Sequence, residues 1–278
     1  MILVDNSQIL IASIFQNIKS NPDMDIDFIR HLVFNSYRFI NKKFGKQYGK
    51  IVICNDSGPS WRKTRFPHYK ENRKRRQEKS DLNWKEIYEN MSQVRSELID
   101  VLPYKNLKIT GAEADDIIAV LAKHHHQTQP ILIISNDNDF QQLQIYPEVH
   151  QYSTFKKDFI RCESPKQYLI DHIMEGDSGD GIPNILSDDD TFVTEGKRQI
   201  RLTQNKRKEI MKNLDSSGQD WSGKWDRNKL LIDLSQIPED IEDQIIQAYS
   251  QPTQTKISLL DYMISHKLNN LLESVGDF

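Results

Sequence analysis

Residues 130–137, with the sequence PILIISND, decide the fold class. Aliphatic residues in an unbroken run, bounded by a proline and a polar turn, are typical of a strand that is buried on both faces of a sheet. Residues 2–5 (ILVD) and 50–56 (KIVICND) have the same form. Because helical patterns lie between these segments, the sequence predicts an α/β fold with a mostly parallel, twisted sheet that is flanked by helices.

The second half of the chain has a different pattern. After residue 164 the strand patterns fade, and helical stretches alternate with turns rich in glycine and aspartate. We therefore expect an α/β domain over residues 1–163 and a helical region over residues 164–278, which includes a basic helix at about residues 195–212.

Length and composition exclude several classes of protein. The chain has 278 residues, of which 37% are hydrophobic, so it can bury a substantial core. No apolar run approaches the roughly 20 residues that a membrane span requires. Cys54 and Cys162 are the two cysteines, which excludes a disulfide scaffold and a four-cysteine zinc site and indicates a reducing cytoplasm.

Positive charge is concentrated in one segment. Nine lysines and arginines but only two glutamates lie between Trp61 and Lys79, a local charge of +7. Because the whole chain carries −3, the rest of it carries −10. A basic segment on an acidic protein indicates a polyanionic partner, and a solvated charged helix without a partner is the alternative.

Three of the predicted strands end in an aspartate, at Asp5, Asp56 and Asp137. The carboxyl ends of parallel strands face one crevice, so these acids should converge. The start of the next helix and two turns add six more acids: Glu113, Asp115, Asp116, Asp139, Asp177 and Asp180. Each alone could be a cap or turn residue, but together they would repel one another unless cations were bound. Carboxylate oxygens suit Mg²⁺, which Mn²⁺ can replace. Two such ions would fit the hydrolysis of a phosphodiester.

Five sequence features, taken in order, resemble the flap endonuclease and 5′-3′ exonuclease family over nearly the whole chain. They are the strand-end Asp5 and Asp56, FPHYKENR at residues 66–73, GAEADD at 111–116, SNDNDF at 135–140 and GDSGDGIP at 176–183. The resemblance implies a resolvase-like (PIN-like) core, an arch at about residues 58–82 and a helix-three-turn-helix-like DNA-binding region in the second half. Most members continue with a G-x-G-x-K-[ST]-A hairpin, which residues 184–190 (NILSDDD) replace here.

The resemblance also implies roles for individual residues. One ion would be held by Asp5, Asp56, Glu113, Asp115 and Asp137, and the other by Asp139, Asp177 and Asp180, while Asp116 would be a ligand or only a partner of the helix dipole. Lys70 and Arg73 would grip the scissile phosphate. Tyr69 would either stack on a base of a threaded strand or pack against aliphatic side chains of the arch. The further nucleic-acid contacts would come from Arg62, Arg65, Lys74, Arg75, Arg76, Arg198, Arg201, Lys206 and Arg207.

The implied activity is that of a Mg²⁺-dependent 5′-3′ nuclease with ribonuclease H, exonuclease and flap endonuclease action. The Trp61–Arg62 pair and the long second half resemble the ribonuclease H branch of T-even-like phages. That branch implies a monomer in the cytoplasm of a bacterial host, which acts on forked or flapped DNA and RNA–DNA hybrids during lagging-strand replication, beside a sliding clamp and a single-strand-binding protein. A single-strand ribonuclease with a related carboxylate sheet and a non-catalytic binder of branched DNA are the alternatives.

Overall fold

The structure, a computed structural model, describes residues 1–20, 24–213, 220–253 and 255–278. A six-stranded sheet in the order β3-β2-β1-β4-β5-β6 forms its centre. The strands are β1 (Ile2–Asp5), β2 (Ile51–Asn55), β3 (Lys105–Lys108), β4 (Ile131–Ile134), β5 (Val149–Ser153) and β6 (Asp158–Ile160). All neighbouring strands pair in parallel except β5 and β6, which confirms the predicted sheet. The sequence patterns missed β5 and the edge strand β6, because both mix polar with apolar residues.

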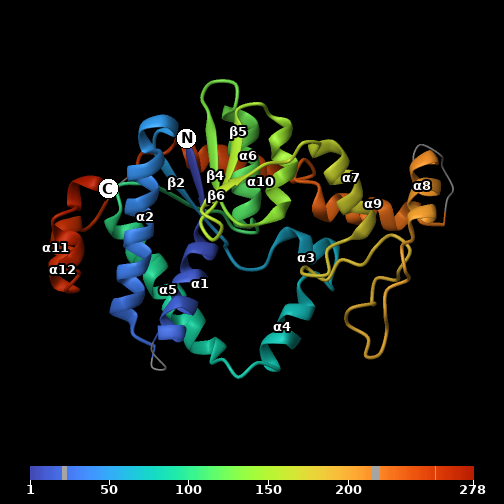
Figure 1. Cartoon of the computed structure of the whole chain (residues 1–278), viewed down its shortest axis with the longest axis horizontal. Coiled ribbons are helices and arrows are strands. Elements are labelled where there is room, and N and C mark those ends of the chain that lie inside the picture. Colours follow the sequence, from blue (N-terminus) through green and yellow to red (C-terminus); the bar gives the residue numbers. More distant parts are fainter. Residues whose placement is uncertain (21–23, 214–219, 254) are drawn as a thin grey trace.

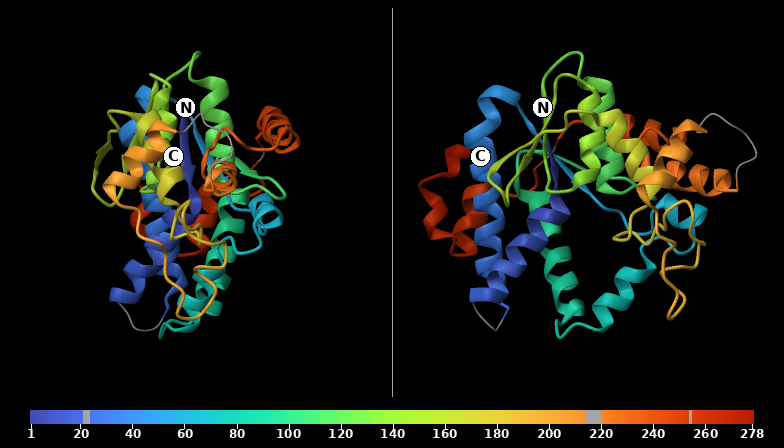
Figure 2. Two further views of the ribbon diagram at one scale, coloured as in Figure 1. Left: turned by 90° about the vertical axis from the view of Figure 1, so that its right-hand side faces the viewer. Right: turned by 45° about the vertical axis from the view of Figure 1, so that its right-hand side comes forward.

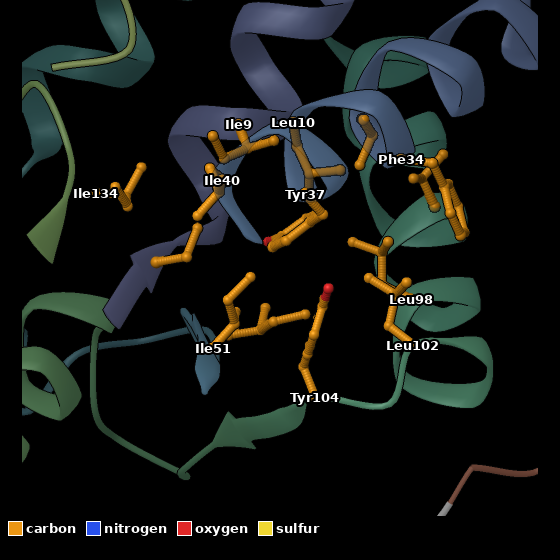
Figure 3. Close-up of a cluster of buried hydrophobic side chains, with 14 of the residues drawn as sticks. Ile9, Leu10, Phe34, Tyr37, Ile40, Ile51, Leu98, Leu102, Tyr104 and Ile134 are labelled. Carbon is orange, nitrogen blue, oxygen red and sulfur yellow. The ribbon is translucent and has the colours of Figure 1, made fainter. Parts of the chain in front are cut away.

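Helices cover both faces of the sheet (Figure 1). α1 (Asn6–Ser20), α2 (Ile26–Tyr48) and α5 (Trp84–Val101) pack on one face, and α6 (Ala114–His125) and α10 (Glu239–Ser250) on the other. Side chains alternate along each strand, so Ile2 and Val4 enter the first layer while Leu3 enters the second. Figure 3 shows the first layer, in which strand residues such as Ile51 and Ile134 meet Tyr37 and Leu98 from the helices. The sheet is therefore anchored on both sides, and its strand ends are held in place.

The basic segment forms two short helices, α3 (Trp61–Arg65) and α4 (Glu71–Glu78), followed by α5. No residue of α4 is buried. α4 and α5 form a V that extends away from the sheet, and α4 leads back toward α3 and the second half (Figure 2). The expected arch is therefore a helical projection that begins and ends at the body of the protein.

The second half of the described chain is helical, as predicted. It contains α7 (Pro165–Glu175), α8 (Gln204–Lys212), α9 (Ser222–Ile232), α10, α11 (Leu259–Ser265), α12 (Asn269–Leu272) and the 3₁₀ turn η2 (Val275–Asp277); a longer 3₁₀ helix, η1 (Asn138–Ile145), follows β4. Phe278 packs against Phe34 at the end of the chain. No helix in the described ranges is long and apolar enough to cross a bilayer.

The predicted basic helix at residues 195–212 is wrong in its first half, because the helix begins only at Gln204. Gly196 has a φ of +76°, and Ile200 exchanges backbone hydrogen bonds with the side chains of Asn184 and Ser187. Tertiary hydrogen bonds therefore hold this stretch extended. The described residues between the turn at 176–183 and α8 form no helix, so the helix-three-turn-helix detail stays a prediction.

Candidate metal centre

Asp5 and Asp56 lie at the carboxyl edge of the sheet, and each is oriented by a serine. Ser135 Oγ donates to Asp5 Oδ2 at 3.3 Å, and Ser7 Oγ donates to Asp56 Oδ2 at 2.5 Å. The backbone N–H of Ala114, at the start of α6, binds the other oxygen of Asp56. Neither serine was predicted as part of the site, although each lies two residues from a candidate acid and could have been noticed by that spacing.

Glu113 connects the arch to the sheet edge. It is buried, and its carboxylate accepts hydrogen bonds from Ser60 Oγ (2.9 Å), Arg62 Nη1 (3.0 Å) and Tyr69 OH (3.0 Å). The ammonium group of Lys70 forms an ion pair with its other oxygen. Donors from residues 60–70 therefore fix this carboxylate.

Asp116 has protein partners on both carboxylate oxygens. Trp61 Nε1 and the backbone N–H of Glu113 donate to Oδ2, and Arg62 Nη1 lies 2.8 Å from Oδ1. Asp116 is completely buried. Burial raises its pKa, and Arg62 opposes that effect. The geometry thus favours a structural role for Asp116 at the start of α6, as a partner of the helix dipole, over the role of a metal ligand.

Asp115 and Asp139 face the interior of the site. Burial and the nearby carboxylates of Asp5 and Asp137 raise the pKa of Asp115 well above its ordinary value. Burial, Asp137 and Asp177 do the same for the pKa of Asp139. A void of about 10 Å³, roughly the space of one water molecule, is lined by Asp115, Asp139, Asp177 and Asp180 together with Arg62, Tyr69 and apolar side chains. Carboxylates gathered around such a small space fit a hard divalent cation.

The turn after α7 brings the last acids to the site. Asp177 Oδ1 accepts from the backbone N–H groups of Gly179 (2.6 Å) and Asp180 (3.3 Å). Gly176 has a φ of +69°, and a Cβ there would lie 2.4 Å from the carbonyl oxygen of Ile182, so only glycine fits. One ligand atom each of Asp139, His172 and Asp177 lie within 4.8 Å of one another. His172 was not predicted, although it lies one helical turn before the Gly-Asp motif.

The arch packs directly against this turn. Asn72 Nδ2 donates to the carbonyl of Ser178 at 2.6 Å, and Arg76 Nη2 donates to that of Gly179 at 2.9 Å. Arg73 pairs with the carboxylate of Asp180, whose other oxygen lies 2.9 Å from Tyr69 OH.

The charge of the arch also sets the state of Asp180. Lys70 Nζ lies 3.5 Å from its carboxylate, between Asp180 and Glu113. Burial raises the pKa of Asp180, but Lys70 and Arg73 outweigh burial and hold that pKa below its ordinary value. Lys70 and Arg73 therefore lie at the edge of the acid cluster.

Two expected nucleic-acid contacts are wrong for this conformation. Tyr69 is 4% exposed and packs among Phe66, Ile173 and Leu231, so its ring is not free to stack on a base. Arg62 is 2% exposed, and besides its two carboxylates it donates from Nε to the carbonyl of Leu231 at 2.8 Å. Both side chains are anchors between the arch and α9, because burial places them among apolar and acidic partners.

The other candidate cations lie mostly at the surface. Arg65, Lys74, Arg75, Arg76, Arg198 and Arg201 are exposed. Lys206 pairs with Glu209 within α8, and Arg207 pairs with Glu175 of α7 at 2.5 Å. The acidic run that replaces the family hairpin is bound by cations as well, since Lys197 and Lys224 pair with Asp188 and Arg227 pairs with Asp189.

We predict that Arg62→Ala destabilises the protein by about 3–5 kcal/mol, because it leaves Asp116 buried without a counterion. Urea unfolding at pH 7 measures the effect. Arg65→Ala is the matched control, since Arg65 is an exposed arginine of the same helix, and its effect should stay within about 0.5 kcal/mol. Equal stability of the two variants would contradict the structural role of Arg62.

We predict a pH-dependent gain in stability for Asp5→Asn in metal-free buffer. Burial and the charge of Asp56 raise the pKa of Asp5 from 3.8 to about 7. The protonated form favours folding, so that contribution is complete below pH 4 and is lost as the pH rises through 7. The variant should therefore match the wild type near pH 4 and exceed its stability at pH 8. Added Mg²⁺ should stabilise the wild type more than the variant, and equal stabilisation would contradict a cation at Asp5.

Two protein-family models match the chain. Residues 1–169 match the model described as 5′-3′ exonuclease, N-terminal resolvase-like domain, and residues 163–278 match the model described as T4 RNase H, C terminal. The ribonuclease H of Enterobacteria phage T4 is 31% identical over 99% of this chain and 95% of its own length. The flap endonuclease Xni of a Shewanella species is 31% identical over 48% of this chain and 51% of its own length.

Solved structures show the same fold. The 5′-exonuclease of phage T5, with bound zinc, has a TM-score of 0.66 at 18% identity and covers 91% of this chain and 99% of its own. The T5 flap endonuclease in a complex with DNA and metal ions has a TM-score of 0.65, also at 18% identity, over 90% of this chain and 99% of its own. The α/β part is thus a resolvase-like fold joined to a helical second half, and the chain belongs to the 5′-3′ exonuclease family, with a second half of the T4 ribonuclease H type.

Proposed function

We propose that the chain is a two-metal 5′-3′ nuclease with ribonuclease H, 5′ exonuclease and flap endonuclease activity. The observation that carries the proposal is the convergence of acids from different elements. Asp115, Asp139, Asp177 and Asp180 line one small void, the charges of Asp5 and Asp137 at the sheet edge act on Asp115, and Lys70 pairs with Glu113 and Asp180 beside them. Two divalent ions held there would stabilise the attacking and leaving oxygens of a phosphodiester displacement. The 31% identity with a named ribonuclease H over nearly the full length supports the same activity.

The family resemblance divides the acids into two sets. We assign one ion to Asp5, Asp56, Glu113, Asp115 and Asp137, and the other to Asp139, Asp177 and Asp180. All of these donors are carboxylate oxygens, which suit Mg²⁺ and also Mn²⁺. The pKa values of Asp5, Asp115 and Asp139 are raised because burial and neighbouring carboxylates disfavour their charged forms. A bound cation would relieve that repulsion.

Lys70 and Arg73 are the residues that we assign to the scissile phosphate. Their cationic groups neutralise Glu113 and Asp180 in this structure. Once divalent cations neutralise those carboxylates, the two side chains can turn to a phosphate at the same place. There a positive charge stabilises the negative charge that develops in the transition state.

Substrate binding would use the surface cations. Arg65, Lys74, Arg75 and Arg76 of the arch would bind the 5′ strand, and Arg198, Arg201, Lys206 and Arg207 would bind duplex phosphates behind the cut. We assign the catalytic α/β domain to residues 1–163 and duplex binding to residues 164–278, which also contribute Asp177 and Asp180 to the metal centre. Forked or flapped DNA and RNA–DNA hybrids are the proposed substrates. A monomer in the bacterial host cytoplasm, working beside a sliding clamp and a single-strand-binding protein, is the proposed setting.

We predict that Asp115→Asn lowers the rate of Mg²⁺-dependent cleavage by at least about 100-fold, because it removes a ligand charge from the centre of the site. Binding of a flapped duplex should stay the same or tighten, since less negative charge faces the phosphates. Sizing the products from a 5′-labelled flap and an RNA–DNA hybrid measures the first effect, and a binding titration without Mg²⁺ measures the second.

Asp171→Asn is the matched control, because Asp171 is an acid of the neighbouring cleft that carries no proposed metal role. Its rate should stay near that of the wild type. Turnover of Asp115→Asn at the wild-type rate would refute the metal assignment. Fork binding by the wild type without any cleavage would favour a non-catalytic DNA-binding protein.

We predict different effects for two basic residues of the arch. Lys70→Ala should lower kcat far more than it weakens DNA binding, because Lys70 lies at the acid cluster. Arg75→Ala should weaken binding and reduce its salt dependence by about one counterion, because Arg75 is exposed on α4. Single-turnover rates and affinities across a salt series measure both. An equal loss of affinity, with kcat unchanged in either variant, would make the arch a general phosphate-binding surface.

A further inference from the structure

His172 lies among the acids that we assign to the second ion. It is in the last turn of α7, and its Nδ1 lies 3.4 Å from Asp139 Oδ1 without forming a hydrogen bond to it. Nδ1 is shielded from solvent and has no hydrogen-bond partner among the described residues. The side chain is 15% exposed and lines a cleft of about 510 Å³, together with Asp137, Asp139 and Asp177. A buried nitrogen without a partner, next to two carboxylates, is a ligand group without an assigned role.

The spacing of this group fits a single cation. One ligand atom each of Asp139, His172 and Asp177 lie within 4.8 Å of one another. Ligands about 2.1 Å from one octahedral ion lie about 3 Å apart when adjacent and about 4.2 Å apart when opposite. His172 Nδ1 and Asp139 Oδ1, 3.4 Å apart, are already near the spacing of adjacent ligands, and Asp177 has to approach them for all three to share one ion. The ring of Tyr168 supports the orientation of the His172 ring, because the two rings pack edge to face with their centroids 5.7 Å apart.

We propose that His172 Nδ1 is a nitrogen ligand of the second metal ion, beside Asp139 and Asp177. The inference rests on the proposed function and adds a ligand of a different class to its site. Imidazole suits first-row transition ions better than it suits Mg²⁺. The second site would therefore bind Mn²⁺ or Co²⁺ with a preference over Mg²⁺ that an all-carboxylate site would not have.

A hydrogen bond from His172 to Asp139 is the competing role. In that case Nδ1 carries a proton that points to the carboxylate, and the ring only positions Asp139. The two roles differ in one measurable respect, because only a ligand nitrogen is bonded to the metal and couples strongly to its unpaired electrons.

The test uses Mn²⁺ alone as the probe, bound to the full chain without DNA. Electron spin echo modulation detects ¹⁴N that is bonded to Mn²⁺. The wild type should show this modulation, and His172→Gln should lose it. His150→Gln is the matched control, since His150 is exposed near the start of β5, away from the strand ends that carry the acids, and it should keep the modulation. Calorimetric titration should show a Co²⁺ affinity about tenfold lower in His172→Gln, with a much smaller change for Mg²⁺.

The outcomes separate this inference from the proposed function. If the wild type binds Mn²⁺ at a site that Asp177→Asn abolishes, but shows no ¹⁴N modulation, His172 is not a ligand and the metal centre stands. If the wild type binds no Mn²⁺ that depends on Asp177, the metal centre itself is refuted. The spectrum of the wild type decides the first question without any variant, so a failure of His172→Gln to fold would not leave it open.

Discussion

Carboxylates that are buried at one edge of a sheet repel one another, and the architecture of this protein depends on how that repulsion is compensated. Asp5, Asp115 and Asp139 have raised pKa values because burial and neighbouring acids act in the same direction. Asp180 has a lowered pKa because Lys70 and Arg73 reach it. The protein thus neutralises some of the clustered acids, such as Asp180, with its own cations, and leaves others, such as Asp115 and Asp139, without that compensation. That division is the electrostatic condition for a metal centre.

The same compensation joins the two halves of the chain. The hydroxyl group of Tyr69 lies 3.0 Å from the carboxylate of Glu113 and 2.9 Å from that of Asp180. This single side chain therefore links the start of α6 to the turn at 176–183. Arg62 reaches from the acids of α6 to the backbone of α9. These anchors are buried, whereas the outer face of α4 is exposed. The arch therefore has a fixed base and a basic surface that remains available to a polyanion.

The segment that replaces the usual hairpin is held by contacts within the protein itself. Asp188 and Asp189 are held by Lys197, Lys224 and Arg227 through pairs that lie mostly at the surface. Asn184 and Ser187 hold the extended stretch before α8. The shape of the turn at 176–183 does not depend on this segment, because it is set by Gly176 and by the contacts with the arch. Duplex contacts in this region would then depend on side-chain cations.

The acids and their places on the chain could be read from the sequence, because apolar runs that end in aspartate indicate parallel strands whose carboxyl ends meet. The family resemblance added the arch and the turn at 176–183. The patterns did not reveal β5 and β6, which mix polar with apolar residues, nor the extended stretch before α8, which tertiary hydrogen bonds hold.

Local pattern also could not separate buried from exposed arginines. Arg62 and Arg65 belong to one helix, yet Arg62 is enclosed by Glu113 and Asp116 while Arg65 is exposed. His172 likewise became part of the site only when α7 packed beside η1. The sequence by itself determined which chemical groups the protein carries and which strand ends present them. Only the tertiary structure decided which of those groups meet, because burial and charge pairing depend on neighbours that are distant along the chain.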